Sequence, residues 1–181
     1  MEATIIVFVV RKFYAKGHSK ARRYVCKAKE VFAMAYREIW HEMIIKASPS
    51  ELYQALTDVK KLAHWWTTET QGESAVGKKL EFWFYGKLLK EMVVTTLKVD
   101  ELVRWRATER SDPDWVNTEI EWKIFREGDK TFLHLRHSKW REDAKVFPQS
   151  SMHWVLFLLS LKEFVETGKG RPHPYDMPVG L

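Results

Sequence analysis

Between residues 78 and 137, apolar and polar positions alternate with a period of two, which predicts β-strands. The breaks between the apolar runs are short, and residues 111–114 and 126–129 have the composition of turns. Short connections between successive strands predict an antiparallel meander with one face on a core and one in solvent. The expected core positions are Leu80, Phe82, Phe84, Val103, Trp105, Ala107, Ile120, Trp122, Ile124, Leu133 and Leu135.

A looser alternation over residues 37–46 predicts another strand ahead of this region. Residues 48–57 begin with a serine N-cap, a proline at the first helical position and a glutamate that completes a capping box. They predict a short helix, and residues 59–66 predict a second short helix. Residues 67–77 are polar and carry no periodic pattern, so we expect a connecting segment there.

A long helix is predicted over residues 150–167, because its apolar residues recur at helical spacing and Gly168 ends the pattern. The apolar stripe of this helix must face the sheet. We therefore expect an α+β fold in which a twisted antiparallel sheet of six or seven strands lies around the long C-terminal helix. Residues 168–174 are rich in glycine and proline and are expected to form an exposed tail.

Charge separates the chain into a basic extension and a neutral body. The whole chain of 181 residues has a net charge of +6, and residues 1–33 hold eight Lys and Arg against two Glu, which accounts for all of it. Such an extension suits a nucleic-acid or anionic-lipid arm, a targeting segment, or an extension that is poorly ordered or helical, and we favour the last. We expect three parts: this extension over 1–36, a domain over 37–170 and a C-terminal tail over 171–181. Nothing suggests that the neutral body binds nucleic acid.

The single cysteine, Cys26, excludes an internal disulfide and a cysteine-based zinc cluster, which suits a reducing, cytoplasmic location. The longest apolar run, residues 5–10, is far shorter than the roughly 20 residues needed to cross a bilayer. No transmembrane segment is therefore expected. We expect no metal and no cofactor, because the chain has no glycine-rich phosphate loop and no recognisable ligand cluster.

The inward faces of the predicted strands are aromatic and aliphatic, which indicates an apolar chamber between the sheet and the long helix. We interpret it as a pocket for a small hydrophobic or aromatic molecule. The alternative is that the same side chains simply fill the core. Because adjacent residues in a helix face different ways, one indole of the Trp65–Trp66 pair is expected in the core and the other near the open end of the chamber. The candidate ligand-binding residues are Trp65, Trp66, Phe82, Phe84, Trp105, Trp122, Leu133, Leu135, His137, Trp154 and Leu158.

Polar candidates for chemistry are few. His134 and His137 are three residues apart on a strand and therefore face opposite sides, so they cannot share a metal. His137 lies on the inward side, where it is either a ligand-orienting residue at the rim or a hydrogen-bonded structural residue. Glu91 shares the parity of Leu89 and Val93 and is a candidate inward general base with a raised pKa. No second inward carboxylate and no nucleophile elbow is present.

Several segments resemble the START-like (SRPBCC) superfamily, and specifically its branch related to activators of the heat-shock-protein-90 ATPase. The resemblance covers about residues 37–170. It implies a helix-grip fold, in which a curved antiparallel sheet holds the C-terminal helix around a cavity, and it implies no common catalytic residues. The segments that carry it are Ile44–Asp58, Leu62–Trp66, Val76–Gly77, Thr131–Ser138, His153–Trp154 and Leu158–Gly168.

Three functions follow as hypotheses. The first is non-enzymatic binding of a small hydrophobic molecule, since no acid–base pair is apparent. The second is a cyclase or dehydratase that uses Glu91 or His137 for proton transfer. The third is an interaction module that has a chaperone as its partner and stimulates the chaperone's ATPase through its surface.

Overall fold

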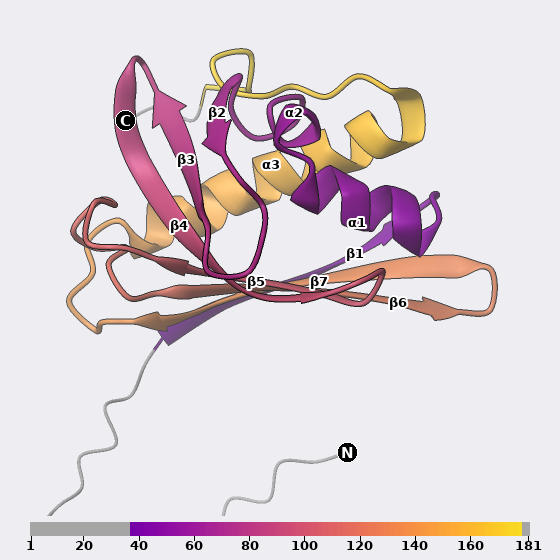
Figure 1. The fold of residues 1–181 in the computed structure, drawn as a ribbon, viewed down its shortest axis with the longest axis horizontal. Helices are drawn as coiled ribbons and strands as arrows, with labels where there is room; N and C mark the ends of the chain where they lie inside the picture. The colour runs from indigo at the N-terminus through magenta and orange to yellow at the C-terminus, as the bar shows by residue number, and fades with distance from the viewer. Residues whose placement is uncertain (1–36, 179–181) are drawn as a thin grey trace, which may run out of the picture. The chain divides into compact units, whose positions relative to one another are not determined.

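The computed structural model describes residues 37–178 and shows an α+β fold with one seven-stranded antiparallel sheet, as predicted (Figure 1). The strand order is β1-β7-β6-β5-β4-β3-β2. The basic extension expected over residues 1–36 lies outside the described residues. The strands are β1 (Arg37–Ile45), β2 (Glu69–Gly72), β3 (Lys79–Phe84), β4 (Lys87–Lys98), β5 (Leu102–Ala107), β6 (Glu119–Glu127) and β7 (Lys130–Trp140), and the helices are α1 (Pro49–Thr57), α2 (Val59–Leu62) and α3 (Phe147–Thr167).

Helix α1 begins where its sequence signals predict. The Ser48 hydroxyl accepts a hydrogen bond from the backbone N–H of Glu51 (3.2 Å), and the Glu51 carboxylate accepts one from the N–H of Ser48 (2.8 Å). These bonds satisfy donors that a helix start otherwise leaves free. Helix α2 ends at Leu62, four residues before the predicted end, and residues 63–66 form a turn.

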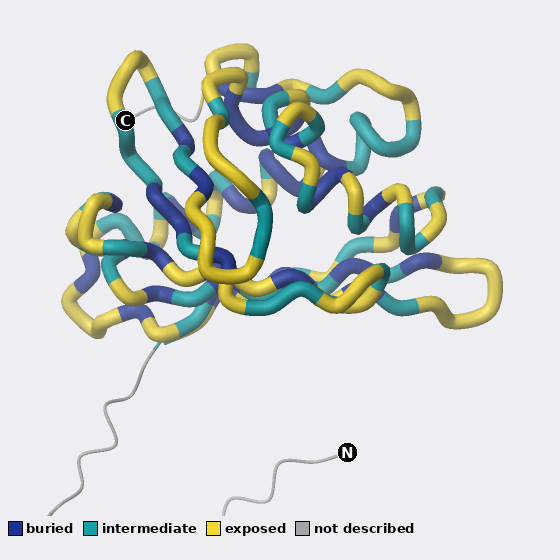
Figure 2. Tube along the Cα trace, viewed as in Figure 1, coloured by how far each residue is buried: buried dark blue, intermediate teal, exposed yellow. Residues whose placement is uncertain are grey.

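The core lies between the inner face of the sheet and one face of α3, with α1 and α2 covering one end (Figure 1). Buried and exposed positions alternate along β6 and β7, as the period of two predicts (Figure 2). Seven of the nine tryptophans are buried. Helix α3 begins at Phe147 instead of residue 150 and ends at Thr167. Gly168 caps it, and its φ of 82° is the left-handed conformation common at helix C-termini.

Two segments differ from the sequence prediction. The polar stretch over residues 67–77 contains the short edge strand β2, which its composition does not reveal because three of its four residues are exposed. Gly72 has a φ of 108°, and a Cβ there would collide with the carbonyl oxygen of Lys79. Only glycine therefore allows β2 to lie this close to β3.

The expectation that residues 168–174 form an exposed tail is wrong for Pro172 and His173, although Gly168, Lys169, Arg171 and Pro174 are exposed. Residues 171–178 fold back onto the domain, and Pro172 and His173 are buried. The backbone N–H of His173 donates to the Trp66 carbonyl (2.9 Å), and the His173 carbonyl accepts from the N–H of Thr68 (3.0 Å). A glycine- and proline-rich sequence cannot continue a helix, but it can still pack in an irregular conformation when its backbone groups find partners. We call residues 171–178 the C-terminal segment.

Candidate functional site

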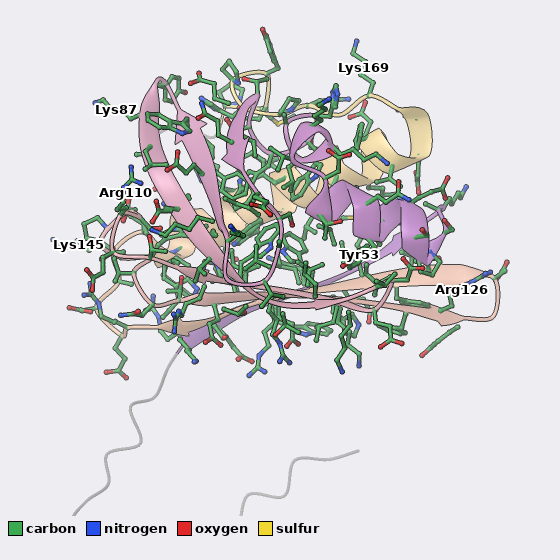
Figure 3. All side chains as sticks on the ribbon, in the orientation of Figure 1. Tyr53, Lys87, Arg110, Arg126, Lys145 and Lys169 are labelled. Carbon is green, nitrogen blue, oxygen red and sulfur yellow. The ribbon has the colours of Figure 1, made fainter. Side chains whose placement is uncertain are left out.

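A pocket of about 530 Å³ opens between four parts of the domain: the β3–β4 hairpin, the β5–β6 loop, the first half of α3 and the C-terminal segment. Lys87, Arg110 and Lys145, labelled in Figure 3, mark the hairpin, the loop and the chain just before α3. The volume is within the range of small-molecule sites. The lining residues are Trp66, Phe84, Tyr85, Leu89, Lys90, Asp112, Trp115, Val146, Gln149, Ser150, His153, Trp154, Phe157, His173, Pro174, Asp176, Met177 and Pro178.

One side of the pocket is an aromatic wall. The ring centroid of Trp66 lies 5.1 Å from that of Trp154 and 6.3 Å from that of Phe157. Trp115 continues the wall at 6.0 Å from Trp154, and Phe84 lies 6.4 Å from Phe157. These separations are typical of packed aromatic pairs, so the wall is rigid and apolar.

The other side carries charged and polar groups, among them Lys90 on β4, whose side chain is largely enclosed. Its ammonium lies 4.0 Å from the centre of the Trp115 ring, a cation–π contact, and 3.8 Å from Oδ2 of Asp112. Burial lowers the pKa of Lys90 to about 8, although Asp112 and Asp114 act in the opposite direction. A lysine in this position is still charged at neutral pH, but it holds its proton far less firmly than an exposed lysine.

Two histidines complete the polar side. His173 of the C-terminal segment has Nδ1 3.2 Å from Oδ1 of Asp176. Burial lowers the pKa of His153 on α3, and the charges of Lys90 and His173 lower it further, against the opposing effect of Asp176. His153 is therefore neutral at physiological pH.

Three of the predicted ligand-binding residues, Trp66, Phe84 and Trp154, line the pocket. An open chamber was predicted between the sheet and the long helix, but aromatic side chains pack against one another there. The pocket lies to one side, toward the β3–β4 hairpin. The role of the remaining candidates as ligand contacts stays a prediction; the structure places them in the packed core behind the pocket. They are Trp65, Phe82, Trp105, Trp122, Leu133, Leu135, His137 and Leu158.

Trp65 lies in the core and Trp66 lines the pocket, as expected, but neither ring is exposed at the rim. Both side chains are buried and stack with their centroids 5.9 Å apart, because they lie in the turn after α2 and not within a helix. The Trp65 indole N–H donates to the carbonyl of Ala55 (2.9 Å) and fixes that ring in the core. Trp66 packs in front of it and forms part of the pocket wall.

His137 lies inside the core and not at the rim of the pocket. It is fully buried; its Nε2 lies 2.9 Å from Oγ1 of Thr118, and its Nδ1 accepts a hydrogen bond from the Trp154 indole (3.0 Å). Burial, with the charge of Lys90, holds its pKa well below the usual range. His134 faces the other side of the sheet, where it contacts Glu42 (2.7 Å), so the prediction of opposite faces is confirmed.

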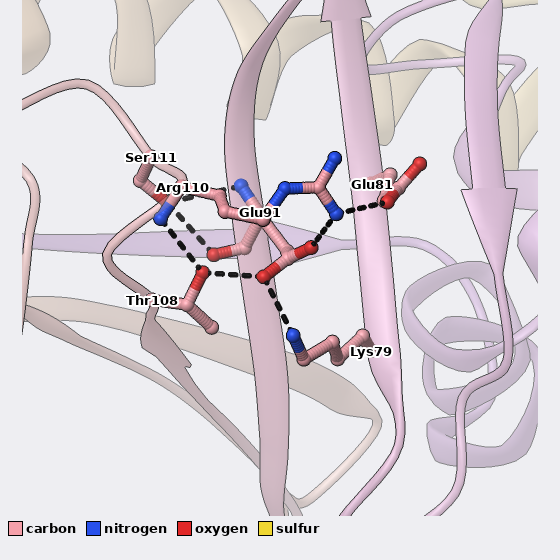
Figure 4. Close-up of polar contacts among 6 residues, drawn as sticks. All are labelled: Lys79, Glu81, Glu91, Thr108, Arg110 and Ser111. Carbon is pink, nitrogen blue, oxygen red and sulfur yellow. Dashed lines mark hydrogen bonds and ion pairs between the residues drawn. The ribbon is translucent and has the colours of Figure 1, made fainter.

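Glu91 is covered completely, but it faces away from the core, so the inward general base predicted at this position is wrong (Figure 4). Its carboxylate accepts hydrogen bonds from Thr108 (2.6 Å), Lys79 (2.9 Å) and Arg110 (2.6 Å). Burial favours a higher pKa, but the hydrogen bonds of Thr108 and Lys79 and the charges of Lys79 and Arg110 outweigh it. The pKa of Glu91 is therefore lowered, which does not suit a base at neutral pH.

The Glu91 network ties the β5–β6 loop to β4. The Ser111 hydroxyl donates to the Glu91 carbonyl (2.7 Å) and accepts from the Glu91 N–H (2.9 Å), and the Asp112 N–H donates to the Leu89 carbonyl (2.8 Å). Because Asp112 and Trp115 belong to this loop, the network positions one end of the pocket.

The sequence reasoning missed Lys90, Trp115, His153 and His173. Lys90 shares the parity of Met92 and Val94, both buried, so the alternation along β4 contains the signal that it faces inward. Trp115 follows a turn sequence that gives no indication of burial. His173 is in the segment that was expected to be exposed.

Within residues 37–178, no cluster of three or more metal-ligating side chains occurs. None of the helices in that range is long and apolar enough to span a membrane.

Residues 46–166 match the model of the Activator of Hsp90 ATPase homolog 1-like protein family. The chain belongs to this family. The resemblance seen in the sequence is thereby confirmed, and so is the curved antiparallel sheet with a C-terminal helix. No curated protein matches the sequence.

Solved structures share this fold. The Aha1 dimer from Colwellia psychrerythraea is 36% identical, with a TM-score of 0.68, and the match covers 74% of this chain and 99% of that chain. Protein MLL2253 from Mesorhizobium loti is 18% identical, with a TM-score of 0.65 and 71% and 96% of the two chains covered. CalU16 from Micromonospora echinospora is 19% identical, with a TM-score of 0.60 and 74% and 78% covered.

Proposed function

We propose that this protein binds a small hydrophobic or aromatic molecule, without catalysing a reaction on it, in the pocket between the β3–β4 hairpin, α3 and the C-terminal segment. The observation that carries this proposal is a pocket of about 530 Å³ with an aromatic wall. Burial of an apolar ligand there is favoured by about 25 cal/mol per Å² of apolar surface removed from water. The rigid wall lowers the cost of ordering side chains on binding.

The positions of the two candidate proton-transfer residues favour binding over catalysis. Glu91 faces away from the pocket and is ion-paired, and both ring nitrogens of His137 are engaged inside the core. Variants of either residue are therefore expected to leave any conversion of a pocket ligand unchanged. A loss of turnover in Glu91→Gln or His137→Gln, with folding intact, would support the enzymatic alternative.

The test uses native mass spectrometry of the purified chain, followed by titration with N-phenyl-1-naphthylamine, a neutral aromatic probe that becomes fluorescent in apolar sites. We expect a co-purified small molecule or saturable probe binding. Gln149→Trp places an indole in the pocket and should abolish both signals. The matched control, Gln54→Trp on the exposed side of α1, should bind normally. Probe binding that is absent from the unaltered chain, or equal in the two variants, contradicts the proposal.

A second function is supported by family membership and by the 36% identity to the Aha1 protein from Colwellia psychrerythraea. In that role the domain acts as an interaction module that stimulates a chaperone ATPase through its surface. The Gln149→Trp variant separates the two roles in an ATPase assay with heat-shock protein 90. If the Gln149→Trp variant still stimulates the ATPase activity, the surface role is supported. If neither the variant nor the unaltered chain stimulates it, the surface role is excluded. The cytoplasmic location stays a prediction.

A further inference from the structure

The two charged side chains of the Lys90–Asp112 pair differ in their exposure to solvent. The Lys90 side chain is 12% exposed, whereas that of Asp112, the other member of the pair, is 30% exposed and so better solvated. Lys90 faces the same side of the sheet as the buried residues Met92 and Val94 and lies against the Trp115 ring. A cation therefore lies on the polar side of the pocket, against the Trp115 ring and largely shielded from water.

The carboxylates near Lys90 leave this cation incompletely paired. Among the described residues, the only carboxylate oxygen within 4 Å of its ammonium is Oδ2 of Asp112, and at 3.8 Å it is beyond hydrogen-bonding distance. Asp114 accepts hydrogen bonds from Arg141 (3.0 Å) and from the backbone N–H groups of Lys145 (2.7 Å) and Val146 (3.1 Å). Across the pocket, Asp176 is engaged with His173. Within residues 37–178, the Lys90 ammonium therefore donates no hydrogen bond to a carboxylate oxygen.

We propose that the ligand of this pocket is an amphipathic anion, whose aromatic body lies against the wall formed by Trp66, Trp154 and Phe157 and whose acidic group pairs with Lys90. This inference rests on the proposed binding function and adds the chemical class of the ligand. An anionic oxygen that replaces the missing partner of Lys90 forms a charge-assisted hydrogen bond in an apolar setting. A neutral ligand of the same shape would cover the ammonium without pairing it.

The lowered pKa of Lys90 agrees with this geometry. Desolvation without a close counter-charge favours loss of the proton, and an anion beside the ammonium would reverse that effect. The other titratable groups that face Lys90 are Asp112, Asp114, His137 and His153. Carboxyls and imidazoles ordinarily titrate below pH 7, so Lys90 dominates the pH dependence of binding above it.

The experiment compares two probes that differ by one sulfonate group. N-phenyl-1-naphthylamine is neutral, and 1-anilinonaphthalene-8-sulfonate is the same molecule with a sulfonate. We expect the sulfonate to bind more tightly at pH 7. Its affinity should fall by about tenfold between pH 7 and pH 9 as Lys90 loses its proton, whereas that of the neutral probe should stay constant.

Substitutions assign the effect to Lys90. Lys90→Met keeps the length and apolar character of the side chain, and should weaken sulfonate binding by about tenfold to 100-fold while leaving the neutral probe within twofold. Lys90→Arg keeps the charge and should retain sulfonate binding within a few-fold. Lys87→Met, at the exposed hairpin tip, is the matched control for general electrostatics and should change neither affinity.

The outcomes separate this inference from the function on which it rests. If the neutral probe binds and is blocked by Gln149→Trp, but the sulfonate binds no better and is insensitive to Lys90→Met, the anion proposal is overturned and the pocket function stands. If neither probe binds, the pocket function itself fails. Sulfonate binding that persists in Gln149→Trp reports another surface and also overturns the proposal.

Discussion

The covered carboxylate of Glu91 gives the most quantitative prediction. Glu91→Gln keeps the size of the side chain but removes the charge that pairs with Lys79 and Arg110. A hydrogen bond to a charged group contributes about 1.5–3 kcal/mol. Both cations are more than half exposed and regain water when the carboxylate is lost, so we expect a net loss of about 2 kcal/mol in the free energy of unfolding at pH 7.

Two comparisons test this reasoning. Glu119→Gln on β6 removes a carboxylate that is 37% exposed and pairs with Lys139, and it should cost less than about 1 kcal/mol. The double variant Lys79→Met/Arg110→Met leaves the Glu91 carboxylate covered and without a cation, and should cost about 3–5 kcal/mol, more than loss of the carboxylate itself. The assay is urea unfolding monitored by circular dichroism. The slope of the unfolding free energy against urea concentration should be the same in all variants.

The contribution of Glu91 to the free energy of unfolding is expected to fall as the pH is lowered. The pKa of Glu91 is lowered in the folded state, so its contribution is present above the pKa of the unfolded chain, roughly 4.3, and is lost as the pH falls through the folded pKa. The unaltered chain and Glu91→Gln should therefore converge in stability on acidification. A Glu91→Gln cost equal to that of Glu119→Gln, or a difference that is undiminished in acid, would refute the reasoning.

Further predictions concern the C-terminal segment, helix α1 and the buried histidine. Gly170→Ala places a Cβ against the carbonyl oxygen of His64, so it should loosen the C-terminal segment and lower the affinity of the neutral probe severalfold in a fluorescence titration. Ser48→Ala removes the N-cap of α1 and should cost about 1 kcal/mol in urea unfolding. Because folding lowers the pKa of His137, protonation of the unfolded chain should reduce stability by up to about 1.4 kcal/mol per pH unit below about pH 6.5. His137→Gln should lose that slope between pH 6.5 and pH 5 in the same assay.

Local patterns predicted the fold well because each has a direct physical cause. The capping residues before α1 satisfy backbone donors, and the alternation along β6 and β7 matches the pleat of a strand that has one buried face. These signals depend only on near neighbours in the sequence. They located α1 correctly, and they placed His134 and His137 on opposite faces.

The site could be predicted only in part, because it depends on contacts between distant segments. Glu91 was predicted to face inward from its apolar neighbours Leu89 and Val93, but the partners of its carboxylate lie 12 to 19 residues away in sequence. The aromatic character of the core was predicted, but periodicity does not reveal whether rings leave a space or fill it. That outcome is set by side-chain volumes and packing, which no local pattern reports.

The C-terminal segment gives the pocket a wall that is independent of the sheet. Its backbone attachment near the pocket consists of the two hydrogen bonds that join His173 to Trp66 and Thr68, together with one from the Arg171 N–H to Ser160 on α3. None of these three bonds joins two of the seven strands of the sheet. If the pocket binds a ligand as proposed, changes near the end of the chain that weaken these bonds are expected to speed ligand exchange more than they lower global stability.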